Sequence, residues 1–231
     1  MMKKNGFTLA EVLITLAIIG VVATITLPSL MSNTQEQQAV TAFRKAMNTL
    51  NEVAQMNAAV DGFDYGGIAL LAVPGGNNVT IYNDGGVLTQ SLWAMFASKA
   101  QVDQTRSGTA NNKGPGGSCE GNVIAFRDGT MLCYTDTITN TGSNIVIPAV
   151  VDTNGRKAPN RMSTCSTETC STAAAAGGQG AQSKAIGDQF RITLYNGMAI
   201  PGNVTVTNGG SFQDVANNAA ENNAARWAMS K

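Results

Sequence analysis

The stretch FTLAEVLITLAIIGVVATITLPSL, residues 7–30, decides the fold of this chain. Residues 12–27 carry no charge, and Glu11 is the single charged side chain in the whole stretch. As a helix, its 24 residues (30 − 7 + 1) would extend roughly 36 Å, enough to cross a hydrocarbon core of about 30 Å. The stretch therefore predicts a membrane-spanning helix.

The six residues before this stretch, MMKKNG, are short and basic. Positive charge beside a span keeps that end cytoplasmic, so the C-terminal bulk is predicted to cross the membrane. A secretory signal peptide would look similar, but no clear small-residue cleavage site follows the apolar run. A plain signal anchor does not account for Glu11 either, because a charge inside a membrane costs about 2.5–3.5 kcal/mol and usually has a partner.

The composition narrows the possible functions. The chain has 231 residues, of which 43% are hydrophobic and 13% charged, and it contains no histidine. Without histidine, a Ser-His-Asp or Cys-His nucleophile and a His-ligated zinc or haem site are impossible. The 15 basic and 15 acidic side chains argue against a strongly basic nucleic-acid binder. No catalytic constellation is evident, so we do not expect an enzyme.

Residues 3–14, KKNGFTLAEVLI, resemble the N-terminus of type IV prepilins and type II secretion pseudopilins. The family pattern is a basic leader ending in glycine, then Phe-Thr-Leu-x-Glu and an apolar helix; Gly6, Phe7 and Glu11 occupy those positions. The resemblance implies that a prepilin peptidase cuts after Gly6 and methylates the new Phe7 amine. It also implies an α+β, pilin-like fold, in which a long N-terminal helix packs on an antiparallel sheet.

The same resemblance implies that Phe7, Glu11, Gly20 and Pro28 serve filament assembly. Glu11 would pair with the Phe7 amine of a neighbouring subunit and set the axial register, because an unpaired buried charge costs several kcal/mol. Pro28 lacks an amide hydrogen and is expected to kink or loosen the helix, which Gly20 weakens about two turns earlier. An assembly ATPase, a polytopic platform protein and other subunits would be the partners.

The sequence predicts four parts: a leader over 1–6, a transmembrane half-helix over 7–30, an amphipathic half-helix over 31–61 and an exported head over 62–231. Asp61-Gly62 is a plausible helix stop. The second half-helix should pack on the sheet through an apolar stripe that steps by three and four residues. Its members are Val40, Phe43, Met47, Leu50 and Ala54.

The head should contain short helices and strands marked by turn signals. We predict a helix within 89–101 capped by Thr89, and a hairpin of 122–127 and 130–136 around a two-residue turn at Asp128-Gly129. A strand over 145–151 should lie at a sheet edge because it contains Pro148. The remaining expectations are a hairpin turn at Asn196-Gly197 after strand 189–195, and a short helix within 212–229.

Residues 150–160, VVDTNGRKAPN, and the later GDQF at 187–190 resemble a subset of prepilins with Val-Asp-x-Asn-Gly-x-Lys-x-Pro-Asn and Gly-x-Asp-x-Phe segments. Here no residue separates Gly187 from Asp188, and residues 162–186 form an insertion. Asp152, Asn154 and Asp188 offer the oxygen ligands that calcium prefers, and some major pseudopilins bind calcium. The alternative is a turn whose side chains bond their own backbone. Apart from this possible calcium ion, the sequence predicts no cofactor.

Four cysteines, Cys119, Cys133, Cys165 and Cys170, allow three connectivities. Export to an oxidising compartment predicts disulfides. A small loop closed by Cys165 and Cys170 would leave Cys119 for Cys133. The two-residue turn places Cys133 opposite Ile124, so that pairing needs the preceding loop to fold back. A four-thiolate zinc site is the alternative, but the spacings lack the usual paired knuckles.

The leading hypothesis is a filament subunit, held in the inner membrane with its head in the periplasm or outside the cell before it polymerises. A minor pilin for DNA uptake or adhesion is one alternative, since Arg156, Lys157 and Arg161 form a small basic cluster. Such a cluster is usually a solvated turn, so nucleic-acid binding is not expected. The other alternative is a membrane-anchored, exported binding domain.

Overall fold

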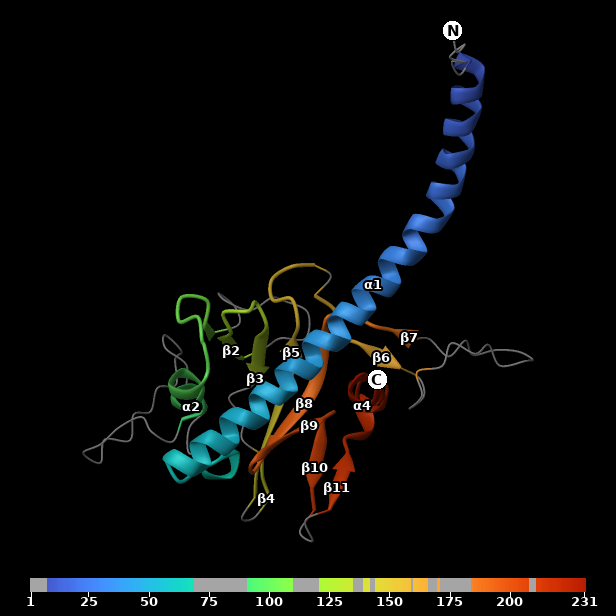
Figure 1. Ribbon diagram of the computed structural model, residues 1–231. Helices are drawn as coiled ribbons and strands as arrows, with labels where there is room; N and C mark the ends of the chain where they lie inside the picture. Colours follow the sequence, from blue (N-terminus) through green and yellow to red (C-terminus); the bar gives the residue numbers. More distant parts are fainter. Residues whose placement is uncertain are drawn as a thin grey trace. The chain divides into compact units, whose positions relative to one another are not determined.

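The computed structural model describes residues 8–68, 91–109, 121–134, 139–141, 144–158, 160–165, 170, 184–207 and 211–231. The chain divides into two compact units, residues 1–38 and residues 39–231. Helix α1 (Leu9–Val60) belongs to both units, and every strand belongs to the second (Figure 1). We call this second unit the head. The predicted leader, including Gly6, and Phe7 lie outside the described residues.

In the first unit, α1 contains a segment, Leu9–Leu27, that is long and apolar enough to cross a membrane. This agrees with the span predicted from the sequence. The helix is uninterrupted at Gly20 and Pro28. Because proline has no amide hydrogen, the carbonyl of Thr24 loses its usual partner four residues on. A kink or local loosening at Pro28 stays a prediction.

In the head, α1 buries the predicted apolar stripe. All five stripe members are at most 6% exposed, and Phe43, Leu50 and Ala54 are fully or almost fully buried. The helix ends at Val60, and Gly62 follows with a φ of +79°, the left-handed conformation that glycine adopts without strain. The predicted stop at Asp61-Gly62 is therefore confirmed.

A seven-stranded antiparallel sheet forms the centre of the head, in the order β1-β2-β3-β5-β8-β9, with β4 also paired to β5. Helix α1 packs on it, and the rings of Phe43 and Phe190 stack with centroids 4.4 Å apart. The α+β, pilin-like fold is confirmed. The strands of this sheet are β1 (Gly108–Thr109), β2 (Asn122–Ala125), β3 (Met131–Tyr134), β4 (Thr139–Thr141), β5 (Asn144–Asp152), β8 (Gln189–Tyr195) and β9 (Met198–Pro201).

Smaller elements complete the head. Two further two-stranded sheets pair β6 (Thr164–Cys165) with β7 (Lys184–Ala185) and β10 (Val204–Val206) with β11 (Phe212–Asp214). The helices are η1 (Tyr65–Gly67), α2 (Leu92–Lys99), η2 (Ala216–Asn218) and α4 (Ala219–Ser230). The predicted C-terminal helix is thus confined to the second part of 212–229, and Phe212 belongs to a strand instead.

The first hairpin differs from its prediction by one residue of register. The β2–β3 ladder pairs Val123 with Cys133, so Cys133 does not lie opposite Ile124. The amide of Phe126 donates to the carbonyl of Thr130, which leaves three residues in the turn instead of two. Gly129 takes a φ of +101°, as the last residue of a three-residue hairpin loop often does.

Pro148 does not mark a sheet edge, because β5 is a central strand paired with β3, β4 and β8. Opposite Pro148 on one side is Thr193 of β8. On its other side, pairing with β3 stops at Ala149 and pairing with β4 starts at Val146. The proline therefore occupies the gap between two partner strands, where no described ladder bond requires its missing amide hydrogen.

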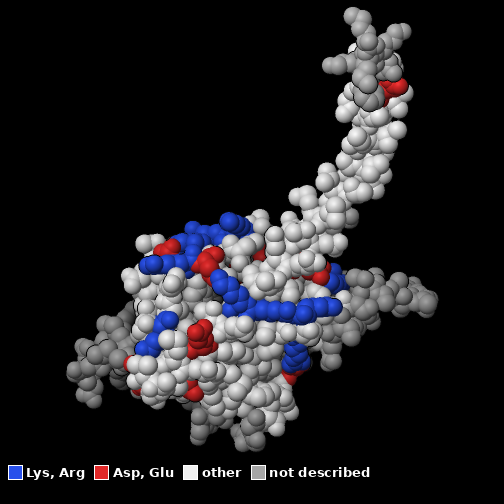
Figure 2. Space-filling model, in the orientation of Figure 1, with Lys and Arg blue, Asp and Glu red and all other residues white. Residues whose placement is uncertain are grey.

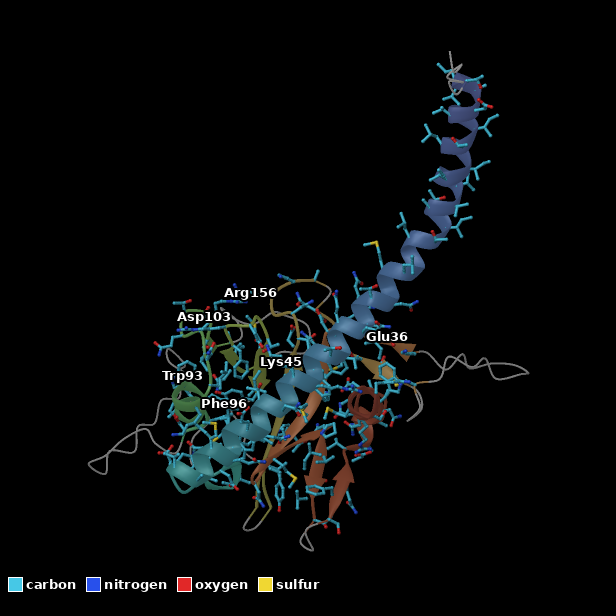
Figure 3. The ribbon with its side chains drawn as sticks, viewed as in Figure 1. Glu36, Lys45, Trp93, Phe96, Asp103 and Arg156 are labelled. Carbon is cyan, nitrogen blue, oxygen red and sulfur yellow. A yellow bond between two sulfur atoms is a disulfide. The ribbon has the colours of Figure 1, made fainter. Side chains whose placement is uncertain are left out.

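Two other head predictions have clear outcomes. The Asn196-Gly197 turn is confirmed, since Tyr195 pairs with Met198 across it and Asn196 has a φ of +46°. Helix α2 exists, but its N-cap is Ser91, whose hydroxyl accepts from the Ala94 amide at 3.0 Å. Phe96 on its buried face contacts the rings of Tyr65 and Phe126, and Trp93 is only partly buried (Figure 3).

Candidate functional site

The start of α1 is held by a reciprocal contact between Thr8 and Glu11. The Thr8 amide and hydroxyl both donate to Oε2 of Glu11 at 2.8 Å, and the Glu11 amide donates to the Thr8 hydroxyl at 3.3 Å. This is a capping box, the Ser/Thr-x-x-Glu arrangement that satisfies the first amides of a helix. Thr8-Leu9-Ala10-Glu11 carries that spacing, although the motif stands inside an apolar run where a cap was not expected.

The capping box fixes where the only charge of the apolar segment lies. Glu11 is the single charged residue in Leu9–Leu27, and its carboxylate is folded back to the first turn, where helix amides and the dipole favour negative charge. A carboxylate can accept about four hydrogen bonds, so it can still receive a cationic donor from outside the helix. Gly6 and Phe7, the predicted cleavage and methylation residues, lie outside the described residues.

Beyond Glu11, the first unit presents an almost continuous apolar surface. Its large side chains are roughly half to three-quarters exposed, from 47% at Val12 to 78% at Leu9. An apolar surface of this length is unfavourable in water, at about 25 cal/mol per Å². It therefore requires lipid or other apolar helices around it.

The hydroxyl groups inside the apolar segment are satisfied by its own backbone. Thr15 donates to the carbonyl of Val12 at 2.9 Å, Thr24 to that of Val21 at 2.8 Å and Thr26 to that of Val22 at 3.0 Å. Such bonds make threonine acceptable in an apolar surrounding, because no hydroxyl proton is left unpaired there.

The predicted calcium ligands lie in the head, where the structure brings Asp152 and Asp188 together. Both are buried. Asp152 accepts from the amides of Asn154 and Gly155 at 3.1 and 2.6 Å and from Gln189 Nε2 at 2.9 Å. Asp188 accepts from the amides of Asn160 and Arg161, both at 2.8 Å. Asp152 thus accepts from the amides of its own turn, and Asp188 binds the segment that follows β5.

Two further observations bear on this pair. Burial, with a smaller contribution from the charge of Asp188, raises the pKa of Asp152 to about 6. The side-chain oxygen Oδ1 of Asn154 is buried without a hydrogen-bond partner in the described part of the chain. Within that same part, no group of three or more acidic, cysteine or histidine residues could hold a metal. Calcium at this pair stays a prediction.

One predicted disulfide is present. Cys165 and Cys170 are bonded, with Cα atoms 5.1 Å apart. Asn223 of α4 donates to the carbonyl of Cys165 at 3.3 Å, which attaches this small loop to the C-terminal helix. Cys133 is also disulfide-bonded, and its predicted partner, Cys119, lies outside the described residues.

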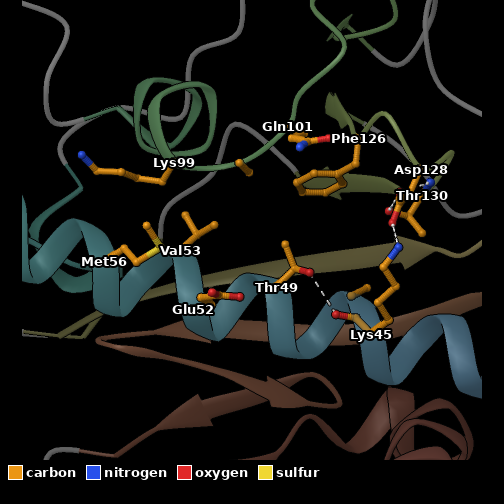
Figure 4. A pocket seen from close by; sticks show the side chains of 12 residues that line it. Lys45, Thr49, Glu52, Val53, Met56, Lys99, Gln101, Phe126, Asp128 and Thr130 are labelled. Carbon is orange, nitrogen blue, oxygen red and sulfur yellow. Dashed lines mark hydrogen bonds and ion pairs between the residues drawn. The ribbon is translucent and has the colours of Figure 1, made fainter.

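A groove of about 360 Å³ lies in the head between α1, the end of α2 and the β2–β3 turn (Figure 4). Lys45 pairs with Asp128 at 2.8 Å on its wall, and Val53, Met56 and Phe126 line it with apolar surface. In the lining, the amide and hydroxyl of Thr130 donate to Oδ1 of Asp128 at 3.0 and 2.7 Å, so this carboxylate serves the β2–β3 turn and the ion pair with Lys45.

Comparison with known proteins agrees with the N-terminal motif. Residues 1–27 match the family described as the prokaryotic N-terminal methylation motif. The chain is 32% identical over 91 residues to the type II secretion system core protein G of Vibrio cholerae serotype O1 (strain ATCC 39315 / El Tor Inaba N16961). The match covers 38% of this chain and 62% of that relative, so the chain spans less than two thirds of the relative's length.

No solved structure matches the chain significantly. The assignment therefore depends on the N-terminal motif, the partial similarity to protein G and the fold. The chain carries the prokaryotic N-terminal methylation motif and is similar over part of its length to a type II secretion system core protein.

Proposed function

We propose that this protein is a structural subunit of a type IV pilus or a type II secretion pseudopilus. The observation that carries the proposal is a methylation motif at the start of an exposed apolar segment, Leu9–Leu27, whose only charge is Glu11. The similarity to a type II secretion core protein supports the same conclusion. The work of the chain is then polymerisation through α1.

Processing by a prepilin peptidase is the first step of the proposal. The enzyme cleaves after Gly6, which has no side chain and lets the scissile bond approach catalytic groups closely. It then methylates the Phe7 amine, leaving a mature chain of 225 residues (231 − 6). The basic pair Lys3-Lys4 keeps this end on the cytoplasmic side until cleavage.

Pairing between neighbours is the second step. In a bundle of α1 helices, the Glu11 carboxylate of one subunit receives the Phe7 amine of the next. Thr8 keeps the carboxylate at the end of the helix, close in sequence to the new N-terminus. A subunit out of register leaves a carboxylate and an amine unpaired in an apolar surrounding, which costs several kcal/mol.

The proposed location is the inner membrane, crossed once by α1, with the head in the periplasm or outside the cell. The Cys165–Cys170 disulfide supports an oxidising compartment for the head. By resemblance to the family, a cytoplasmic assembly ATPase and a polytopic platform protein extract the subunit into a filament with other subunits.

The experiment that tests this function is Glu11→Ala in the full chain, expressed with a complete assembly system. We expect processing to continue but incorporation into sheared filaments to fall at least about tenfold, since a lost buried pairing is worth several kcal/mol. Glu52→Ala is the matched control, because it removes an exposed carboxylate of the same helix within the head. Wild-type incorporation of Glu11→Ala would rule out the pairing mechanism.

A further inference from the structure

Basic side chains gather at one end of the head, where three loops meet (Figure 2). Arg127 lies in the β2–β3 turn, Arg106 in the loop before β1, and Arg156, Lys157 and Arg161 in the segment after β5. Arg106 is partly buried, and the other four side chains are exposed. With Lys45 of α1, they form what we call the basic end.

The three loops are in direct contact. A Cβ atom placed on Gly155 would lie 2.6 Å from the carbonyl oxygen of Gly129 and 3.3 Å from Nη2 of Arg106. The segment after β5 is held by Asp188, which accepts from the amides of Asn160 and Arg161. These contacts bring charges that are 55 residues apart in sequence (161 − 106) onto one surface.

The carboxylates near the basic end are already engaged or buried. Asp128 pairs with Lys45 at 2.8 Å, and Asp103 accepts from the amide and hydroxyl of Thr105 at 3.0 and 2.7 Å. Asp152 and Asp188 are buried. Among the described residues, the outer surface therefore carries six basic groups against two carboxylates, Asp103 and Asp128, and attracts anions.

The basic end lies where the chain enters the head. The Lys45–Asp128 pair joins the β2–β3 turn to the first turns of the helix within residues 39–60. The other end of that helix is marked by the pair between Lys99 and Asp61 at 2.9 Å. Lys45 follows Leu27, the last residue of the apolar segment, by 18 positions (45 − 27). As helix, these 18 positions correspond to about 27 Å of chain between the apolar segment and Lys45.

We propose that the basic end docks on the anionic phospholipid headgroups of the membrane that holds α1, before the subunit enters a filament. This rests on the proposed single-pass placement of α1. Guanidinium groups recognise phosphate oxygens through paired hydrogen bonds. Because α1 tethers the head, docking is intramolecular and needs only the weak attraction of a few charges.

Docking would hold the waiting subunit against the bilayer. Each basic residue near an anionic surface raises the equilibrium constant for the docked over the undocked head roughly fivefold at moderate salt. The contact is also reversible, since these attractions are screened within about 10 Å. Extraction into a filament then has to break a set of weak ionic contacts in addition to moving the apolar segment.

The test uses the full chain inserted in nanodiscs of phosphatidylcholine alone or enriched in phosphatidylglycerol. Amide hydrogen exchange is followed in 103–107, 127–130 and 153–158. We expect these segments to exchange several-fold more slowly in the anionic nanodiscs, and the difference to disappear at high salt. Arg127→Gln with Lys157→Gln should remove most of this several-fold difference, because each lost charge weakens the attraction to the anionic surface. Lys184→Gln with Lys231→Gln is the control pair and should retain it.

Insertion of α1 is checked separately by co-purification of the chain with the nanodisc, so failure of the single-pass placement is distinguishable from failure of docking. Equal exchange in both lipids, with insertion intact, would overturn the proposal. Equal loss in the control pair would also overturn it, because the effect would then be one of net charge. Protection by duplex DNA but not by phosphatidylglycerol would assign the basic end to nucleic acid instead.

Discussion

Glu11 needs a partner at each stage of the life of this chain. Before assembly, Thr8 of the same helix supplies it through two hydrogen bonds at 2.8 Å. In a filament, the proposed partner is an amine of a neighbouring subunit. The residue type was evident from the sequence because one carboxylate interrupts an apolar run. The capping contact was not, because it depends on where the helix begins.

Gly6→Ala tests processing at the residue scale. Adding a methyl group beside the scissile bond should leave mostly unprocessed precursor, because the peptidase requires close approach at this position. The measurement is the ratio of precursor to mature bands, with Asn5→Ala as the neighbouring control. Efficient cleavage of Gly6→Ala would contradict the proposed cleavage site.

Asp152 gives a pH prediction. Its folded pKa of about 6 lies above its ordinary value of 3.8, so the folded state binds the proton more tightly than the unfolded state. Its contribution to stability is therefore full below about pH 4 and is lost as the pH rises through 6. Asp152→Asn should remove on the order of 2 kcal/mol of that pH dependence.

The measurement is thermal unfolding of the head in the detergent-solubilised full chain, at several pH values from roughly 4.5 to roughly 7.5. Asp152 loses its proton in the folded state within this range. Asp214→Asn is the control, because that carboxylate is exposed in β11. An unchanged pH dependence in Asp152→Asn would show that another group titrates.

At the scale of elements, α1 and β8 share the aromatic contact between Phe43 and Phe190. Both rings are fully buried, so Phe43→Ala should destabilise the head by about 3–5 kcal/mol. Chemical denaturation of the solubilised chain measures this. Ala58→Gly, at an exposed position of the same helix, should cost only about 1 kcal/mol. A loss in Phe43→Ala no larger than that in Ala58→Gly would mean that burial of the Phe43 ring contributes little to the stability of the head.

Some boundaries of helices, turns and strands could be predicted from the sequence, and others could not. The stripe of α1, its stop at Gly62 and the Asn196-Gly197 turn were predictable, because each depends on local spacing or on a single conformational preference. The register of the first hairpin was not, since Asp128-Gly129 fits both a two-residue and a three-residue loop. The prediction of a sheet edge from Pro148 was wrong for a different reason. The strand β5 is central because it pairs with β3 and β8, and the local sequence does not show that β8 lies beside it.

The N-terminal part of the candidate site could be predicted from the sequence, but the basic end of the head could not. Glu11 and the apolar segment follow from the order of apolar and charged residues along the chain, and the family resemblance supplies Gly6 and Phe7. The basic end could not be assembled from sequence, because Arg106, Arg127 and Arg161 come from separate loops. Only Arg156, Lys157 and Arg161 stand close enough along the chain to suggest a cluster.

At the scale of the whole molecule, two units of opposite character share one helix. The first exposes its apolar surface, and the second buries its own. We expect the full chain to be monomeric in excess detergent and to self-associate as the detergent is diluted, which sedimentation velocity measures. Leu13→Asp with Ile18→Asp should weaken this association, because charges on the apolar surface are costly to bury. Unchanged association in that variant would place the contact in the head.

The threonine hydroxyls of the apolar segment have a consequence for transfer between surroundings. Thr15, Thr24 and Thr26 bond carbonyls of their own helix. A helix moving from bilayer to filament core therefore exchanges no hydrogen bonds at these positions, and one apolar surrounding replaces another at little cost in solvation. The barrier to that transfer then lies at the two ends of the segment, at the Glu11 carboxylate and at the contacts of the head with its surroundings.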